Sequence, residues 1–582
     1  MTVLRSYFGR WLGKLSVLLI IAWFLTIIVS INLMVRNASI NSTSSGLNLR
    51  VDSAQLSNIK NDIKRLKDQN NILRKILLDN NLGTQLNDHI INSKNGQENY
   101  SSSNFIHQSD FNITYIEPLL LYEETRRRIK NDIQEMAYFI NAELKKLKKD
   151  PFKYEDMGEE ISAALESFNE RKKSLFISLD KLSYFDGYRK WREKEVTELS
   201  NLVQKRFKTL QNPQNCQTAK KLLCQINKGC GFGCQIHHLV YCFLVAYGTK
   251  RTLILKSKGW KYQKEGWEAV FKPVSDSCQY NGEPYASWPS VDDSKQVVLL
   301  PIVDSVYPKP IYQPPSVPAD LAHRLEKVHG YPLVWWVGQV IRYLMRPNDE
   351  TRLLLENKKR KMNFNSPIVG VHVRRTDKIG TEAAFHDVNE YMSKVKEYFD
   401  NLEVEPKLRR IYLASDDPKV ISDAQKRYPN YEIIADSDVA QSAAMSKRYS
   451  NVSLRGILMD IHFLSQCDYL VCTFSSQVCR VAYELMQTYH TDAHDKFASL
   501  DDIYYYGGQN PHPQVAIMNH EPKRAEEIQL RINDEIEVHG NHWDGYSKGK
   551  NLRTNAIGLF PSFKIKNPIE AIDFPKYEES PI

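Results

Sequence analysis

Several common features are missing from this sequence, and each absence narrows the range of functions that the protein can have. The 582-residue chain has nine cysteines, but none of them precedes residue 216. It has no GxxxxGK[ST] loop and no GxGxxG motif after a strand candidate, which excludes these two phosphate-binding devices. Lys and Arg are interleaved with Asp and Glu, and no long cationic block carries aromatic residues. The net charge of +9 therefore does not predict a nucleic-acid partner.

Residues 15–35 lack any charged side chain and match the roughly 20 residues that a helix needs to cross a bilayer. A cleaved signal peptide is the competing interpretation, but the apolar run is long for that role and no clear cleavage site follows. Three basic residues precede the run, namely Arg5, Arg10 and Lys14. Only Arg36 directly follows it, so the positive-inside rule predicts a cytosolic tail of residues 1–14 and a lumenal remainder.

Residues 36–115 are expected to form a stem. Apolar residues spaced alternately by three and four predict a short coiled coil over residues 56–77, with Asn70 at a core position. Such an Asn fixes register and strand number, which favours a parallel homodimer; a lone amphipathic helix is the alternative. Residues 80–115 are rich in Asn, Ser, Gln and Gly without periodicity, and are expected to be a flexible linker.

The rest of the chain changes pattern twice. Helical periodicity predicts a helical stem domain over residues 116–215. Residues 216–508 alternate short apolar runs with helical stretches, which predicts a doubly wound α/β region. The expected strands are 252–255, 297–300, 368–373, 411–414, 431–434 and 469–472. Short strand patterns over residues 509–582 resemble an SH3-like barrel, with Trp543 and residues 559–563 supplying groove aromatics. We expect this barrel to have a structural or partner-docking role that helps present the glycan, and the Pro-rich segment 308–318, within the molecule or from another subunit, is one candidate ligand.

The cysteines favour disulfides, because an oxidising lumen oxidises thiols. The cluster of Cys230, Cys234, His237 and His238 is also compatible with a zinc site. The odd total leaves one thiol over, and Cys467 is the candidate.

The segment that carries the chemistry begins with a continuous apolar strand, residues 366–373, which ends in Arg374 and Arg375. In open α/β sheets ligands bind beyond the carboxyl ends of the strands. A guanidinium presents a planar fork of donors that suits a phosphate, so a diphosphate is the expected ligand. The alternative is a surface pair in salt bridges with Asp377 and Glu382.

A metal-dependent sugar transferase would need an Asp-x-Asp motif at a strand end. Residues 415–418 (SDDP) are equally typical of a helix start, and residues 436–438 (DSD) offer no further ligand nearby. We therefore expect arginine rather than a metal ion to neutralise the diphosphate. Glu382 follows in a polar loop, where it is suited to accept a proton with Lys378 orienting it, or is simply a solvated side chain.

Three long motifs resemble the α-1,6-fucosyltransferase family of animals: HVRRTDKIGTEAAFH, LMDIHFLSQCDYLVCTFSSQVCRVAYELMQ and SLDDIYYYGGQN. The resemblance runs from about residue 118 through the barrel, whereas the N-terminal stalk is less similar, and Cys467 stands where the family has a small residue. It implies a GT-B-like enzyme of the Golgi membrane that transfers L-fucose from GDP-β-L-fucose to the innermost GlcNAc of N-glycoproteins. It further implies inversion of configuration and no metal or other cofactor.

The resemblance also implies roles for individual residues. Arg374 and Arg375 would bind the donor diphosphate with Ser476 and Gln477, and Glu382 would be the base with Lys378 beside it. The guanosine would be held by His372, Tyr262 and Asp460. Asp416 and Asp417 match acidic positions of undefined role. The implied disulfides are Cys216–Cys278, Cys224–Cys242, Cys230–Cys234 and Cys472–Cys479.

Two other functional classes remain at this point. A lumenal lectin or cargo receptor would keep the sugar-nucleotide fold and bind glycans without transferring fucose. A transferase that uses another nucleotide sugar would differ only in its donor.

Overall fold

The computed structural model describes residues 116–148, 158–289, 294–376, 380, 383–443, 447–508 and 512–577. The chain divides into two units, Met1–Phe111 and Asn112–Ile582, and every described residue belongs to the second unit. The predicted tail, membrane span and coiled coil lie outside the described residues, as do Lys378 and Glu382. Within the described ranges, no helix is both long and apolar enough to cross a membrane.

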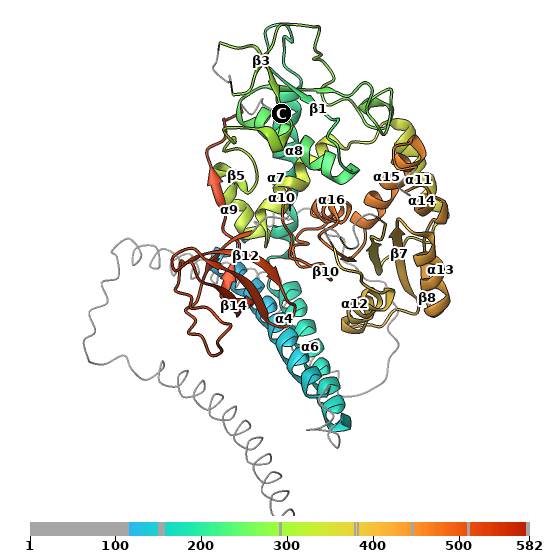
Figure 1. Cartoon of the computed structure of the whole chain (residues 1–582), viewed down its shortest axis with the longest axis vertical. Coiled ribbons are helices and arrows are strands. Elements are labelled where there is room, and N and C mark those ends of the chain that lie inside the picture. The colour runs from blue at the N-terminus through green and yellow to red at the C-terminus, as the bar shows by residue number, and fades with distance from the viewer. Residues whose placement is uncertain are drawn as a thin grey trace, which may run out of the picture. The chain divides into compact units, whose positions relative to one another are not determined.

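The predicted stem helices are confirmed. They are α4 (Leu120–Lys148), α6 (Gly158–Phe185) and α7 (Arg189–Gln211). Helices α4 and α6 lie side by side as a long pair (Figure 1). A buried ion pair ties α4 to α7, because Arg192 Nη2 lies 2.6 Å from Glu123 Oε1 and 2.5 Å from Asp186 Oδ2. Two carboxylates around one guanidinium satisfy the buried charges, which would otherwise be costly.

The α/β region contains two separate parallel sheets. The first has the order β2-β1-β4-β3. Its strands are β1 (Lys221–Gln225), β2 (Thr252–Lys256), β3 (Ala286–Ser287) and β4 (Val297–Leu300). Helix α8 (Phe232–Gly248) is buried along nearly its whole length against this sheet and α10 (Pro332–Leu344). Neighbouring elements are η2 (Trp267–Ala269), η3 (Val303–Ser305), β5 (Ser316–Pro318), α9 (Ala319–Val328) and α11 (Asp349–Lys361).

The second sheet has the order β10-β9-β6-β7-β8 and is also parallel. Its strands are β6 (Ile368–Val373), β7 (Arg409–Ser415), β8 (Tyr431–Ile434), β9 (Tyr469–Cys472) and β10 (Phe497–Ser499). The helices that follow these strands are α12 (Val388–Asn401), α13 (Pro418–Arg427), α14 (Ser437–Ser442), α15 (Asn451–Ser465) and α16 (Gln477–Met486).

The two faces of the second sheet pack on different helices. Ile368 and Tyr412 point toward the core shared with α15 and α16, whereas Val369 and Ile411 point toward α12 and α13. Alternate residues of buried strands face opposite helical layers in this way, so the predicted doubly wound α/β arrangement is confirmed. Gly370 leaves room for Cys467, because an added Cβ would lie 3.1 Å from its Sγ atom.

The C-terminal part forms a five-stranded antiparallel sheet of order β14-β13-β12-β11-β15. Its elements are β11 (His512–Ala516), β12 (Glu535–Asn541), β13 (Tyr546–Asn551), β14 (Ile557–Pro561), η4 (Ser562–Lys564) and β15 (Ile565–Lys566). Trp543 packs edge-on against Tyr138 of α4, and its indole N–H donates to the Asp501 carbonyl at 3.1 Å. The predicted groove aromatic is thus in contact with the stem helix.

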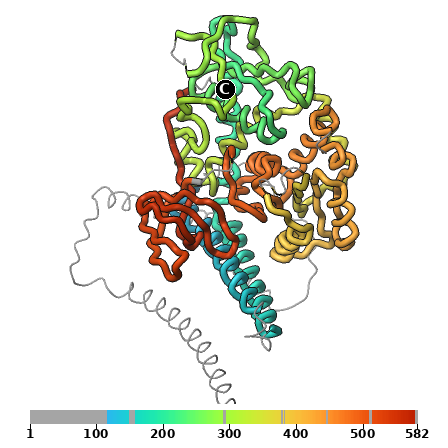
Figure 2. The backbone as a smooth tube through the Cα atoms, viewed as in Figure 1, coloured from blue at the N-terminus to red at the C-terminus, as the bar shows by residue number. Residues whose placement is uncertain are grey.

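The chain then leaves this sheet and returns to β5, an element of the α/β region beside the first parallel sheet (Figure 2). Strand β16 (Glu570–Ile572) pairs in parallel with β5, which ends the Pro-rich segment. Phe574 follows β16 and packs its ring against Tyr312 and Trp336. The Pro-rich segment therefore contacts the tail that follows the barrel strands.

Candidate functional site

The carboxyl edge of the second sheet collects the sequence-predicted residues. Strand β6 lies between β7 and β9, with Val373 beside Ser415 and Val371 beside Val471. Arg374 follows β6, Asp416 follows β7, and the loop 473–476 follows β9. Because parallel strands end at the same edge, these three segments meet there.

Arg374 and Asp416 form an ion pair at this edge. Arg374 Nη1 lies 2.8 Å from Asp416 Oδ2. The same carboxylate accepts the backbone N–H groups of Arg375 at 2.7 Å and Thr376 at 3.0 Å, and the Thr376 hydroxyl at 2.5 Å. Burial alone would raise the pKa of Asp416, but the Arg374 charge and these hydrogen bonds lower it. Asp416 is therefore an ionised anchor that fixes the turn after β6 and orients Arg374.

A second carboxylate anchors the loop after β9. Asp501 accepts the backbone N–H of Phe474 at 2.7 Å and of Ser475 at 3.2 Å, and the hydroxyl of Ser499 at 2.9 Å. Arg375 is held separately, because its guanidinium lies over the Phe385 ring at 4.3 Å. The loops after β6 and β9 are therefore each fixed by a carboxylate that is distant in sequence, Asp416 and Asp501 respectively.

Two helix N-termini converge beside these loops. Helix α16 begins at Gln477 after Ser476, whose side chain makes no cap hydrogen bond, and α8 begins at Phe232 after Gly231, which has no side chain. The two starts touch, because a Cβ added to Gly233 would lie 2.7 Å from the Gln477 carbonyl carbon. First-turn N–H groups and the positive end of a helix dipole favour an anion. Together with Arg374 they form a positively polarised edge that suits a diphosphate.

The three residues expected to hold guanosine occupy different positions. The Arg374 charge acts on both Tyr262 and His372, so these two lie close to the arginine. Burial raises the pKa of Tyr262 to about 12 and lowers that of His372 to about 4, which leaves both side chains neutral. Asp460 lies on α15 and accepts the Tyr412 hydroxyl at 2.9 Å. Burial raises the pKa of Asp460 to about 7.

The remaining acidic positions start helices. Asp417 is the N-cap of α13 and accepts the Lys419 N–H, with Pro418 in the first turn. Asp436 is the N-cap of α14, accepts the Asp438 and Val439 N–H groups, and lies 2.6 Å from Lys358 Nζ. The interpretation of residues 415–418 as a helix start is confirmed, and residues 436–438 also begin a helix.

Four disulfides join Cys216–Cys278, Cys224–Cys242, Cys230–Cys234 and Cys472–Cys479, and Cys467 is a buried thiol. Within the described residues, Cys224, His238 and Cys242 are the one group near enough together to hold a metal ion. The two sulfur atoms are bonded to each other, and His238 Nε2 lies 3.1 Å from the Gln225 carbonyl oxygen. The structure therefore offers no thiolate pair at this cluster.

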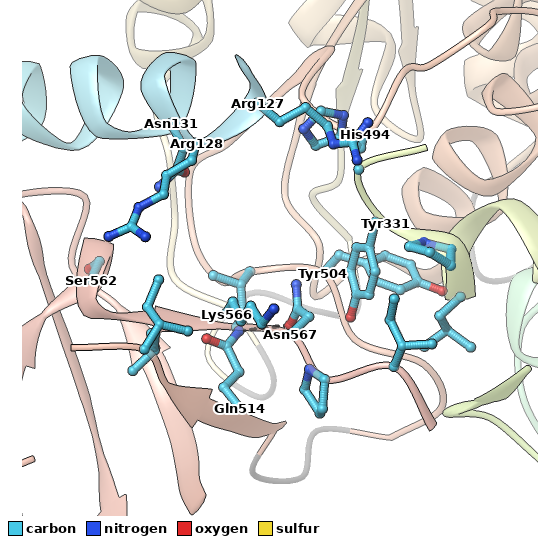
Figure 3. A pocket seen from close by; sticks show the side chains of 18 of the residues that line it. Arg127, Arg128, Asn131, Tyr331, His494, Tyr504, Gln514, Ser562, Lys566 and Asn567 are labelled. Carbon is cyan, nitrogen blue, oxygen red and sulfur yellow. Dashed lines mark hydrogen bonds between the residues drawn. The ribbon is translucent and has the colours of Figure 1, made fainter. Parts of the chain in front are cut away.

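A separate cavity of about 520 Å³ lies between α4, the C-terminal sheet and the segment 329–333 (Figure 3). Arg127 and Arg128 enter from α4, whereas Gln514 and Lys566 come from the sheet. Arg374, Arg375, Asp416 and the loop 473–476 do not line it. The cavity is thus distinct from the site formed by Arg374 and its neighbours.

A buried cluster of His237, Gln477 and Glu484 lies beside the carboxyl edge of the second sheet, and it was not predicted from the sequence. His237 of α8 lies between Gln477 and Glu484 of α16, 240 and 247 residues away in sequence. A helical period would place Gln477 and Glu484 on one face of α16, but it does not reveal that α8 packs there. The role of Asp416 was missed for the same reason, because it depends on the order of strands in the sheet.

Comparison with known proteins identifies the family of the chain. A family model described as alpha-(1,6)-fucosyltransferase N- and catalytic domains matches residues 4–505. The alpha-(1,6)-fucosyltransferase of Drosophila melanogaster is 53% identical over 467 residues, covering 79% of this chain and 75% of that protein. The Caenorhabditis elegans protein of the same name is 40% identical over 455 residues, covering 76% of this chain and 78% of that protein.

Solved structures are also similar in part. Fucosyltransferase NodZ from Bradyrhizobium has 15% identity and a TM-score of 0.31, covering 46% of this chain and 93% of that one. POFUT1 in complex with GDP-fucose has 12% identity and a TM-score of 0.31, covering 47% of this chain and 96% of that one. Similarity at this level supports no conclusion about this chain. The sequence matches confirm the resemblance seen in the motifs, and the chain belongs to the alpha-(1,6)-fucosyltransferase family of glycosyltransferases.

Proposed function

We propose that the chain transfers L-fucose from GDP-β-L-fucose to the 6-hydroxyl of the innermost, Asn-linked GlcNAc of N-glycoproteins. The observation that carries the proposal is the Arg374–Asp416 pair at the carboxyl edge of the second sheet, within the segment that the family model matches. The Arg374 side chain is only 17% exposed, so its charge is weakly screened and acts strongly on a phosphate beside it.

The reaction inverts the configuration of fucose in a single displacement. The acceptor hydroxyl attacks the anomeric carbon opposite the diphosphate, and GDP leaves as negative charge develops on it. Arg374, Arg375 and the N–H groups at the start of α16 stabilise that charge. Glu382 accepts the hydroxyl proton, and Lys378 orients Glu382. Because arginine neutralises the leaving group, no metal ion or other cofactor is required.

The guanine base binds to Asp460, with Tyr262 and His372 bordering the guanosine. An ionised carboxylate accepts the neighbouring N1–H and N2–H donors of guanine as a pair, which adenine does not offer. The two α/β sheets support a GT-B-like arrangement in which the donor binds to the second sheet. Ser476 and Gln477 contact the phosphates from the loop after β9.

The enzyme is a single-pass type II protein of the Golgi membrane with its catalytic part in the lumen. Residues 1–14 form its cytosolic tail and residues 15–35 its membrane anchor. The four disulfides support this compartment, because they persist in an oxidising lumen. The coiled coil at 56–77 makes the enzyme a homodimer, and exposed apolar side chains on α4, such as Leu121 and Ile129, support a further contact between stems.

The C-terminal strands form an SH3-like domain that helps present the glycoprotein. The antiparallel order of the five strands supports this assignment. Because Trp543 is already packed on α4, we expect the domain to recognise partners with other surface residues.

The test is a product assay. The full-length chain in detergent is incubated with GDP-fucose and a GlcNAc-terminated N-glycopeptide, and the glycopeptide is analysed by mass spectrometry with linkage analysis. We expect one α1,6-linked fucose on the innermost GlcNAc, in the presence or absence of EDTA. Glycan binding without transfer would identify a lectin. Activity with another nucleotide sugar alone, or activity lost with EDTA and restored by manganese, would contradict the donor or the metal-free mechanism respectively.

A further inference from the structure

A buried carboxylate and imidazole lie directly behind Gln477. Glu484 is fully buried, and its Oε2 atom lies 2.9 Å from His237 Nε2. The other ring nitrogen, Nδ1, lies 3.2 Å from Gln477 Oε1. The imidazole therefore bridges a buried charge to the first residue of α16.

The hydrogen bonds of this cluster leave Glu484 as an acceptor. The Tyr504 hydroxyl donates to Glu484 Oε1 at 2.6 Å. Burial and the Glu484 charge raise the pKa of Tyr504 well above its usual value, so that hydroxyl keeps its proton. Nε2–H of His237 then donates to the remaining carboxylate oxygen. This fixes the ring and leaves Nδ1 facing Gln477.

The ring nitrogen Nδ1 holds one end of the Gln477 amide. Gln477 Oε1, an acceptor, faces Nδ1, and the Glu484 carboxylate, also an acceptor, faces Nε2, so both ring nitrogens face hydrogen-bond acceptors. With its oxygen held by His237, the planar amide of Gln477 directs its NH2 group to the opposite side.

Other hydrogen bonds hold the main chain around this cluster. The Tyr506 hydroxyl donates to the His237 carbonyl at 2.5 Å, and the two rings lie 5.1 Å apart. Arg480, one turn from Glu484 on α16, donates to the carbonyls of Tyr505 and Gly507, both at 2.8 Å. The cluster thus joins the start of α8, the body of α16 and the segment after β10.

We propose that His237 and Glu484 are positioning residues for the donor: the buried pair fixes the Gln477 amide with its NH2 group toward the diphosphate of the nucleotide sugar. The inference rests on the proposed function, in which Gln477 borders the phosphates. An NH2 group donates to a phosphate oxygen, whereas an amide oxygen in the same place would repel it. The pair acts on donor binding through Gln477 and touches neither substrate.

Glu484→Gln tests this link, because it removes the buried charge at constant size. Nε2 of His237 then loses its charged acceptor, the ring and the Gln477 amide are no longer held in this arrangement, and the amide NH2 group is no longer directed toward the phosphates. We expect the KM for GDP-fucose and the Kd for GDP to rise roughly tenfold or more, the effect of losing a hydrogen bond to a charged group. Gln477→Ala is expected to raise both constants by a similar factor.

The double variant Gln477→Ala/Glu484→Gln separates a positioning role from a structural one. If Glu484 acts through Gln477, the Glu484 change adds less than about twofold to the KM in the Gln477→Ala background. The proposal would be overturned if the double variant raised the KM by the product of the two single-variant factors. An unchanged GDP affinity in Gln477→Ala would also overturn it. His237→Asn serves as a second single variant should Glu484→Gln fold poorly, and it is expected to raise the GDP Kd equally.

Tyr506→Phe is the matched control. It removes a hydrogen bond to the same histidine, but to its main chain, so it is expected to lower the melting temperature while leaving the GDP Kd within about twofold. A GDP Kd raised equally by Tyr506→Phe and Glu484→Gln would overturn the proposal. The wild-type product assay keeps the two claims apart: fucose transfer without coupling between Glu484 and Gln477 rejects only this inference, whereas absence of transfer and of GDP binding rejects the proposed function.

Discussion

The two parallel sheets of the enzyme share an architecture but hold their loops differently. Three of the four disulfides, Cys216–Cys278, Cys224–Cys242 and Cys230–Cys234, lie in and around the first sheet. The second sheet has one, Cys472–Cys479, and its loops are fixed mainly by carboxylates such as Asp416 and Asp501. The difference indicates that covalent cross-links stabilise the first sheet, whereas hydrogen bonds and charge at the edge of the second prepare it for an anionic ligand.

The largest expected effect follows from removing the arginine of the second sheet. Arg374→Ala should lower kcat/KM for GDP-fucose by roughly a thousandfold, because the diphosphate loses a preorganised cation. The matched control is Arg410→Ala, since Arg410 is paired with Glu432 at the opposite end of β7. Arg410→Ala should leave kcat/KM within about threefold. Steady-state kinetics compare kcat/KM of the two variants at a temperature where both are folded. Similar losses of kcat/KM in both would contradict the claim that only the carboxyl end of the sheet binds the donor.

The carboxylate anchor comes next in expected effect. Asp416→Asn keeps the shape but removes the charge that Arg374 and two N–H groups share, so kcat/KM should fall by roughly tenfold to a hundredfold. Asp436→Asn is the control, because Asp436 also follows a strand of this sheet and caps a helix. Asn is an equally good N-cap, so that variant should lose less than about threefold in activity. An unchanged kcat/KM in Asp416→Asn would show that the turn after β6 keeps its conformation without the Asp416 charge.

The pH dependence of GDP binding tests Asp460 of α15, the helix that packs on β6 and β7 of the second sheet. The pKa of Asp460 is raised to about 7, so the carboxyl is protonated below that pH and ionised above it. Guanine requires the ionised form, and GDP should therefore bind roughly tenfold more tightly at about pH 8 than at about pH 6. Calorimetric titration of wild type and Asp460→Asn measures this. The variant should bind weakly with a flat profile, and an equally steep profile would assign the titration to another group.

The smallest expected effect on turnover comes from the first sheet. Replacing Cys216 and Cys278 by serine opens a cross-link between residues 62 apart and should lower stability by about 2–5 kcal/mol, with kcat/KM at low temperature within about twofold. Cys472 and Cys479 are only 7 residues apart, so replacing them releases a short loop, but that loop lies at the edge where we propose that the donor binds. It should weaken GDP binding more than stability. Thermal unfolding measures the stability of the two double variants, and titration measures their GDP affinity. A larger stability loss without Cys472–Cys479, or a larger loss of GDP affinity without Cys216–Cys278, would contradict the account.

Much of the fold could be predicted because its signals are local. The six expected strands all occur, since each is an apolar run bounded by turn residues. Strand β1 was missed because its apolar stretch is short and flanked by Lys221 and Gln225. The Asp416 anchor and the His237–Glu484 pair could not be predicted, because they depend on which strands and helices are neighbours. Local patterns do not encode that order.

The most direct test of the central claim is an experimental structure of the enzyme with GDP. The account predicts that the diphosphate lies against Arg374 and the start of α16, with Asp416 still bound to the turn after β6 and guanine on Asp460. A nucleotide bound at the first sheet, or in the cavity between α4 and the C-terminal strands, would contradict it.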